Sequence, residues 1–247
     1  MALTINGTSS ALALKTDTSN IGLGANAVDS ITTGDYNVGI GDDAMTATTT
    51  GYNNVSLGFE SLKTQTTGHN NTAIGYQSMY STTTGNGRNV AVGAGAMYTN
   101  TTGYESAALG YNALRAQTTG YMNTAIGNTA LQANSTGIEN TAVGHAAGIA
   151  NTTASLNAFG GAYSGNANTT GTQNTAWGQA SMRLNTTGSY NVAVGREALK
   201  SNTTASNNTA IGTSAMMVNT TGTNNTALGA NALDSNTTGS GHTALGK

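Results

Sequence analysis

Side chains that could carry out acid–base or metal chemistry are few in this chain and far apart. The three histidines, His69, His145 and His242, fall in distant parts of the sequence, so they cannot ligate one metal ion within a single chain. Four carboxylates are scattered in the same way, namely Glu60, Glu105, Glu139 and Glu197. The glycine clusters at 22–24 and 93–95 are too isolated to be nucleotide-binding loops. The sequence therefore predicts a protein that is not an enzyme and has no catalytic residues, metal site or cofactor.

Tyrosine is the residue type most suggestive of binding. Of the ten tyrosines, seven lie in one stretch of the chain: Tyr52, Tyr76, Tyr80, Tyr98, Tyr104, Tyr111 and Tyr121. Exposed tyrosines beside Asn and Thr can stack on sugar rings and donate hydrogen bonds, so these residues are candidates for recognition of a cell-surface glycan. The alternative is that they pack over turns or between subunits.

Composition bounds the classes of function. The 247 residues include 34 Gly, no Pro and no Cys, and only 7% are charged, for a net charge of −2. Without a basic stripe the chain is not expected to bind nucleic acid, and without a long apolar run it is not expected to insert in a membrane. A polar, uncharged, Gly-rich chain without Pro fits a tightly wound β structure, because Pro would remove ladder hydrogen bonds.

The sequence repeats with a period of 17 residues. The glycine that ends phrases such as Asn-Thr-Ala-Ile-Gly recurs from Gly24 to Gly246 in steps of 17, except for one step of 18 between Gly75 and Gly93. A second glycine, replaced by Ala154 and Ala205 in two units, marks the other half of the period. Such phase is typical of a repeat protein whose units stack.

Each position of the unit has a constant chemistry. The residue before the first glycine is mostly aliphatic, and the fourth residue after it is mostly Leu or Met. The third residue after it is small in every complete unit: Ala27, Ala44, Ser61, Ser78, Ala96, Ala113, Ala130, Ala147, Ser164, Ser181, Ala198, Ala215 and Ala232. Charges of both signs follow the Leu or Met and indicate a solvated edge, as at Asp29, Lys63, Arg115, Arg183, Lys200 and Asp234.

These patterns predict an all-β, parallel β-solenoid over residues 19–247, with a capping or attachment segment over residues 1–18. Phrases such as Thr-Ala-Ile alternate as in a strand, and the Ala-Leu pair is expected to begin a second short strand. Gly is expected to supply positive φ at both turns. Stacked Ile and Leu would build a thin aliphatic core, and stacked Asn and Thr would form hydrogen-bonded ladders.

The column of small residues predicts self-association. A turn does not require a small side chain at that point in every unit, but close approach of another chain would. We therefore expect this column to be the subunit contact of an oligomer, which a thin solenoid with little apolar surface would need for stability.

One unit breaks the pattern. Gly148 and Gly165 replace the Leu, Gly160 replaces the Ile, and Trp177 stands in the Ile column, with Phe159 nearby. The favoured interpretation is that the large rings fill the volume that glycine leaves empty. The alternative is a bend or a ligand-accessible groove.

The repeat resembles a known family. Asn71-Thr72-Ala73-Ile74-Gly75, Asn191-Val192-Ala193-Val194-Gly195 and Ala113-Leu114 resemble the head repeats of trimeric autotransporter adhesins, and the Asn-Thr-Thr-Gly spacers resemble those of bacteriophage tail-fibre proteins. The resemblance covers about residues 19–247 and implies a left-handed parallel β-roll wound into a homotrimer.

No coiled-coil stalk or membrane anchor accompanies the repeats, so the expected function is a bacteriophage virion fibre, structural or host-attaching, that docks other virion proteins at one or both ends. The alternative is the head of a bacterial surface adhesin. An ice-binding solenoid is less favoured, because the two Thr of Thr-Thr-Gly would point to opposite sides of an extended segment.

Overall fold

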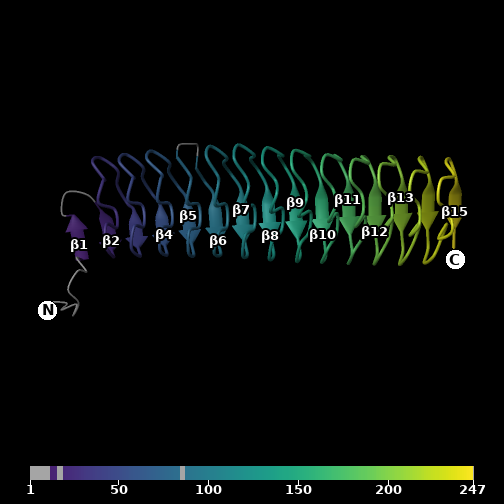
Figure 1. Ribbon diagram of the computed structural model, residues 1–247, viewed down its shortest axis with the longest axis horizontal. Coiled ribbons are helices and arrows are strands. Elements are labelled where there is room, and N and C mark those ends of the chain that lie inside the picture. Colours follow the sequence, from purple (N-terminus) through teal and green to yellow (C-terminus); the bar gives the residue numbers. More distant parts are fainter. Residues whose placement is uncertain (1–11, 16–18, 84–86, 247) are drawn as a thin grey trace.

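The computed structural model describes residues 12–15, 19–83 and 87–246, and it is a straight rod of stacked coils (Figure 1). One 15-stranded sheet runs along the rod with its strands in chain order. The strands are β1 (Leu12–Lys15), β2 (Asn20–Leu23), β3 (Val38–Ile40), β4 (Val55–Leu57), β5 (Thr72–Ile74), β6 (Val90–Val92), β7 (Ala107–Leu109), β8 (Thr124–Ile126), β9 (Thr141–Val143), β10 (Ala158–Gly160), β11 (Thr175–Trp177), β12 (Val192–Val194), β13 (Thr209–Ile211), β14 (Thr226–Leu228) and β15 (Thr243–Leu245).

Strands β2 to β15 are parallel and pair in perfect register. In each pair a residue faces its equivalent one repeat later, as Thr124 faces Thr141 and Ile126 faces Val143. The 18-residue step leaves the register intact, because Thr72 still faces Val90. The predicted all-β parallel solenoid with one coil per repeat is therefore confirmed.

The strand β1 differs from the rest because it pairs antiparallel with β2, with Leu12 opposite Leu23. It covers the edge of the first parallel strand, which would otherwise present unpaired backbone groups. It lies within the predicted segment 1–18; residues 1–11 and 16–18 of that segment lie outside the described residues.

Strands β3 to β15 turn their middle residue inward and their first and last residues outward, except that the last residue of β10, Gly160, is also buried. The middle residue is mostly Ala, and Ala73, Ala125 and Ala210 are completely buried, as are Leu and Met residues such as Leu114 and Met216 on the opposite wall. The expectation that stacked Ile residues build the core is wrong: the aliphatic residue before the first glycine is half exposed, as in Leu109 and Ile126. The coil is so flat that only a small residue fits opposite a Leu or Met of the other wall, so the larger strand side chains point away; Phe159 fits because Gly148 and Gly165 face it.

Asparagines replace apolar side chains in the rest of the core. In the Asn column that precedes each strand, Asn140 donates its Nδ2 hydrogen to the Ala154 carbonyl at 2.8 Å. Its Oδ1 accepts a hydrogen bond from the Asn157 backbone at 3.1 Å. A second buried column, not recognised from the sequence, joins Asn151 to Asn134 at 2.9 Å. These ladders satisfy carbonyls and amides that the narrow interior would otherwise leave unpaired.

The wall opposite the sheet is not a second strand, contrary to prediction. Its Leu and Met residues have positive φ, for example 50° at Leu114 and 49° at Met216. Local turn bonds such as Gln117 N to Leu114 O at 3.1 Å alternate with bonds to the next coil, such as Leu114 N to Ala130 O at 3.0 Å. Along this wall, residues with positive φ alternate with residues of negative φ, as at Asn112 and Leu114. This alternation lets neighbouring coils hydrogen-bond without forming a strand.

Glycine occurs in the two columns for different structural reasons. The first has positive φ, as at Gly75 with 130°, and a Cβ there would lie 2.7 Å from the carbonyl carbon of Gly93. Among the described residues the second column does not adopt positive φ, so that expectation is wrong for it, and Ala154 and Ala205 occupy it in two coils. At the second turn, positive φ falls instead on residues such as Asn53 and Tyr190.

Candidate interaction surfaces

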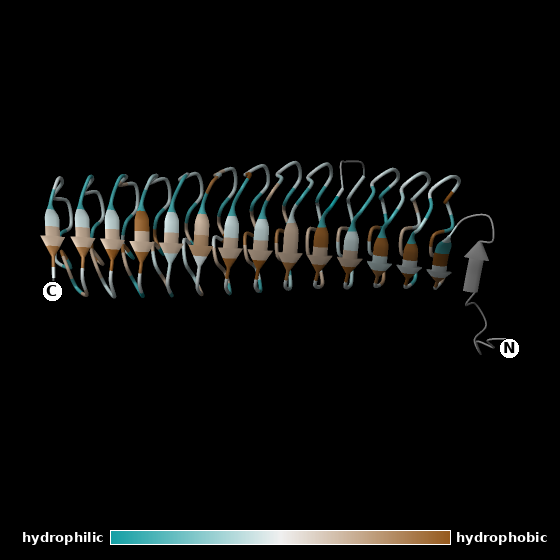
Figure 2. Ribbon diagram, turned by 180° about the vertical axis from the view of Figure 1, so that it is seen from behind, coloured by the Kyte–Doolittle hydropathy of each residue, from teal (hydrophilic) through white to brown (hydrophobic). Residues whose placement is uncertain are grey.

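The outward residues of the strands form a flat surface that we call the sheet face: the first and last residues of β3 to β15, with Ile21 and Leu23 of β2. No residue of these two columns is charged. Leu57, Leu109, Trp177 and Leu228 are 44%, 49%, 52% and 47% exposed. Figure 2 shows the strands side by side along the rod, with more hydrophobic strands towards the N-terminal end, where Val replaces Thr at the first position.

The sheet face is a long, uncharged surface of Leu, Ile, Val, Trp and Thr side chains. Thirteen parallel pairings at about 4.8 Å each give it a length on the order of 60 Å. An exposed surface of this extent with so many aliphatic side chains is uncommon on monomeric proteins and marks interaction sites. The sequence pattern predicts burial of the aliphatic column, whereas the structure exposes it.

The column of small residues is not a subunit contact, which corrects the prediction. From Ala27 at 3% exposed to Ala232 at 2%, every member is buried within its own chain. The hydroxyl of Ser61 contacts that of Ser56, the inward residue of its own strand, and bonds the Gly58 carbonyl at 2.9 Å. Only four residues separate these two positions around the first turn, so the walls converge there and leave room for small side chains alone.

The irregular unit shows volume compensation, as the favoured interpretation predicted. Phe159 is completely buried in the strand position that is usually Ala. A Cβ on Gly148 would lie 2.7 Å from its ring, so the ring occupies the space of the missing Leu side chains. On the sheet face, the Trp177 indole covers Gly160 and occupies the space that a Cβ there would need.

The seven candidate tyrosines do not form one patch. They fall on three lines along the rod: Tyr76 and Tyr111 on one, Tyr80 and Tyr98 on another, and Tyr52, Tyr104 and Tyr121 on the third. Most stack on the equivalent ring one coil away. Tyr104 stacks on Tyr121 at 4.8 Å and Tyr80 on Tyr98 at 5.1 Å between ring centroids, while Tyr52 stacks on His69 at 4.8 Å.

The line of Tyr80 and Tyr98 is flanked by a charged residue of the same column at each end. The Lys63 ammonium lies 6.0 Å from the centre of the Tyr80 ring, and the Arg115 guanidinium lies 4.9 Å from that of Tyr98. We call Lys63, Tyr80, Tyr98 and Arg115 the cation–aromatic ladder. Cations over aromatic faces are favourable contacts that orient the charged group.

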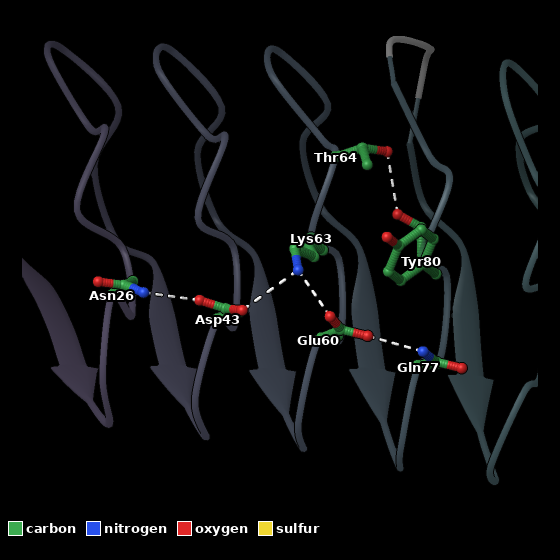
Figure 3. A network of polar contacts seen from close by, with 7 residues as sticks. All are labelled: Asn26, Asp43, Glu60, Lys63, Thr64, Gln77 and Tyr80. Atoms are coloured by element: carbon green, nitrogen blue, oxygen red, sulfur yellow. Dashed lines mark hydrogen bonds and ion pairs between the residues drawn. The ribbon is translucent and has the colours of Figure 1, made fainter.

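Lys63 belongs to a polar network that crosses several coils (Figure 3). It donates to Glu60 Oε1 at 2.6 Å and to Asp43 Oδ2 at 3.2 Å. Gln77 donates to Glu60 at 2.6 Å, and Asn26 donates to Asp43 at 2.8 Å. Donors from Lys63 and Gln77 lower the pKa of Glu60, and donors from Asn26 and Lys63 lower that of Asp43. The network stabilises charge but has no exposed reactive group with a partner base.

The candidate reactive residues remain separate. In the part of the chain that the structure describes, no three His, Asp or Glu side chains group as a metal site would require. The same residues include no helix long and apolar enough to cross a membrane.

The threonines of the Thr-Thr-Gly segments lie in unlike environments. The first hydroxyl donates to the carbonyl of the equivalent residue one coil on, as Thr169 does to Thr186 at 3.0 Å. The second Thr is exposed, as at Thr170 and Thr187. The pair therefore does not present two matching hydroxyl columns to solvent.

Comparison with protein-family models, curated proteins and solved structures found no match to this chain.

Proposed function

We propose that the protein is a structural fibre module that associates with further copies of itself through the sheet face. The observation that carries the proposal is the uncharged row of partly exposed Leu, Ile, Val and Trp side chains along the rod, interrupted only at Gly160, which Trp177 covers. Burial of such surface is worth roughly 25 cal/mol per Å². The small free energy of association contributed by each coil therefore adds up over the length of the rod.

The partner that fits this face best is a second copy of the chain. Its side chains repeat at the spacing of parallel strands, and only a partner with the same spacing stays in register along the full length. The resemblance to trimeric adhesin heads and tail fibres favours three copies. The same resemblance supports assignment to a bacteriophage virion, in a structural or host-attaching role, and mass spectrometry of purified particles tests that assignment.

The association is tested with charge placed on the sheet face. In Leu109→Glu combined with Val194→Glu, two half-exposed side chains become charged without disturbing the core. We expect the wild type to sediment as an oligomer, a trimer by resemblance, and the variant as a folded monomer, because carboxylates would be buried without partners.

Tyr111→Glu combined with Met122→Glu is the matched control, since these side chains are 55% and 47% exposed but lie off the sheet face. The control is expected to keep the wild-type mass in analytical ultracentrifugation. A monomeric wild type, or equal effects of both double variants, would contradict the proposal.

A further inference from the structure

A groove lies on the outside of the wall that carries the Leu and Met column, across the core from the sheet face. Its volume is about 350 Å³, and it is lined by Thr99, Arg115, Ala116, Gln132, Ala133 and Ile149. Small-molecule sites begin at about this size. The groove exists because Ala116 and Ala133 provide only methyl groups between longer neighbours.

Arg115 borders this groove as an oriented cation without an anionic partner. Its guanidinium stacks on Tyr98 at 4.9 Å, and its Nη1 lies 3.4 Å from Asn112 Oδ1. No carboxylate pairs with it among the described residues, whereas Lys63 at the other end of the cation–aromatic ladder pairs with two. The stacking holds the planar donor fork in place, which suits it to bind a carboxylate through two hydrogen bonds.

The other lining residues are complementary in chemistry. The Gln132 side-chain amide makes no hydrogen bond within the described part of the chain, so it offers both a donor and an acceptor. Ala116, Ala133 and Ile149 provide an apolar floor. The fixed cation can bind a carboxylate, the free amide can bind a hydroxyl group, and the apolar residues can contact C–H groups. These three features together match a sugar ring that carries a carboxylate.

We propose that this groove binds one acidic monosaccharide unit, with Arg115 on the carboxylate, Gln132 on a ring hydroxyl and the alanines under the ring face. This proposal differs from the prediction that the charge after the Leu column marks only a solvated edge at this position. It goes beyond the proposed fibre function and does not depend on association through the sheet face, which lies on the other wall.

The test uses the full chain with glucuronic acid as the probe and glucose as the neutral analogue, followed by saturation-transfer NMR and calorimetry. Binding of glucuronic acid but not of glucose is expected. Arg115→Gln should weaken binding about ten-fold or more, because hydrogen bonds to a charged group are lost. Ala133→Leu should abolish binding by filling the groove.

Arg183→Gln is the matched control. Arg183 also lies over a tyrosine, at 5.4 Å from the centre of the Tyr163 ring, and also has no ion-pair partner among the described residues, but it does not line the groove. Its removal should leave the affinity unchanged. Circular dichroism and sedimentation, which report folding and association, should match the wild type for all three variants.

The proposal is overturned if the wild type binds no glucuronic acid at millimolar concentration or binds glucose equally well. It is also overturned if binding survives Arg115→Gln and Ala133→Leu, or if Arg183→Gln weakens it as much as Arg115→Gln.

Discussion

At the scale of single residues, the buried side-chain amides of the Asn column hydrogen-bond to backbone groups of the turns and of the next coil. Most of them accept a hydrogen bond from the next coil and donate one to a turn carbonyl. Asn174, for example, accepts from Asn191 N at 3.1 Å and donates to Gly188 O at 2.8 Å. Since a buried polar group without a partner costs free energy comparable to a lost hydrogen bond, these side chains specify where each coil sits.

Ser106 is the natural exception in this column and leads to a prediction. Its Oγ accepts from Asn123 N at 3.1 Å but is too short to reach the Gly120 carbonyl, which has no donor among the described residues. We expect Ser106→Asn to supply that donor and raise the free energy of unfolding by about 1 kcal/mol in urea denaturation. Ser81→Asn, at a partly exposed site on the other wall, is expected to change little, and a destabilised Ser106→Asn protein would contradict the prediction.

Phe159 is the largest buried side chain and leads to a second prediction at this scale. Phe159→Ala should lower the free energy of unfolding by about 3–5 kcal/mol, because Gly148 and Gly165 cannot fill the resulting cavity. Phe59→Ala is the control, since Phe59 is 44% exposed.

A second variant separates volume from other effects of the ring. Gly165 has a φ of 55°, close to the 50° of Leu114, so a Leu can adopt its conformation. Adding Gly165→Leu to Phe159→Ala should therefore recover part of the loss measured in urea. No recovery would show that the ring does more than fill space.

At the scale of the element, each coil is a strand, a turn and an irregular wall, and side-chain contacts join neighbouring coils. The network around Lys63 links the coils of Asn26, Asp43, Glu60 and Gln77 (Figure 3). Because these groups are partly exposed, solvent screens them, and the network contributes little to total stability.

The network predicts a pH dependence. The pKa of Glu60 and that of Asp43 are lowered in the folded chain, so their stabilising effect is present above the unfolded pKa and is lost as pH falls through the folded pKa. Lys63→Met should raise both pKa values in NMR titrations of the carboxyl groups. The rise should be larger for Glu60, whose largest cause is Lys63, than for Asp43, whose largest cause is Asn26.

Lys200→Met provides the comparison for this titration. It removes the 2.7 Å contact with Glu197 and should raise only the pKa of Glu197. A Glu60 pKa that does not respond to Lys63→Met would contradict the assignment of Lys63 as its main cause.

At the scale of the whole molecule, the rod is a one-dimensional stack in which each coil contacts its neighbours (Figure 1). The stability of such arrays is approximately a sum of unit and interface terms. We therefore expect the molecule to tolerate deletion of a whole coil better than deletion of a large part of a coil.

Deletion of one period tests this property. Removal of residues 196–212 joins Gly195 to Thr213 and keeps every column in register. We expect a folded rod shorter by about 4.8 Å, with unchanged circular dichroism. Removal of residues 196–207 puts Asn and Leu positions out of phase, and the coils beyond the junction should lose protection in hydrogen exchange. Equal behaviour of the two deletions would contradict stacking in register.

The sequence by itself determined the period, the parallel register and the stacking of like residues. Glycines at a constant spacing permit only one alignment of successive coils. The sequence also predicts that Gly75 adopts positive φ at a turn and that Phe159 fills the space left by glycines. Alternation in Thr-Ala-Ile likewise separates two faces of a strand.

Only the tertiary structure decided which face points inward. The alternation is symmetric, and hydrophobicity favours burial of Ile, yet the spacing of the walls admits only a small residue where the other wall carries Leu or Met, as at Ala125 and Leu114. The distance between the two walls depends on the positive φ of residues in the wall opposite the sheet. The Leu and Met residues of that wall give no indication in the sequence that they adopt positive φ. The same wall brings Arg115, Gln132 and Ala133 from successive coils to one groove, because side chains at unlike positions meet only once the coils are stacked.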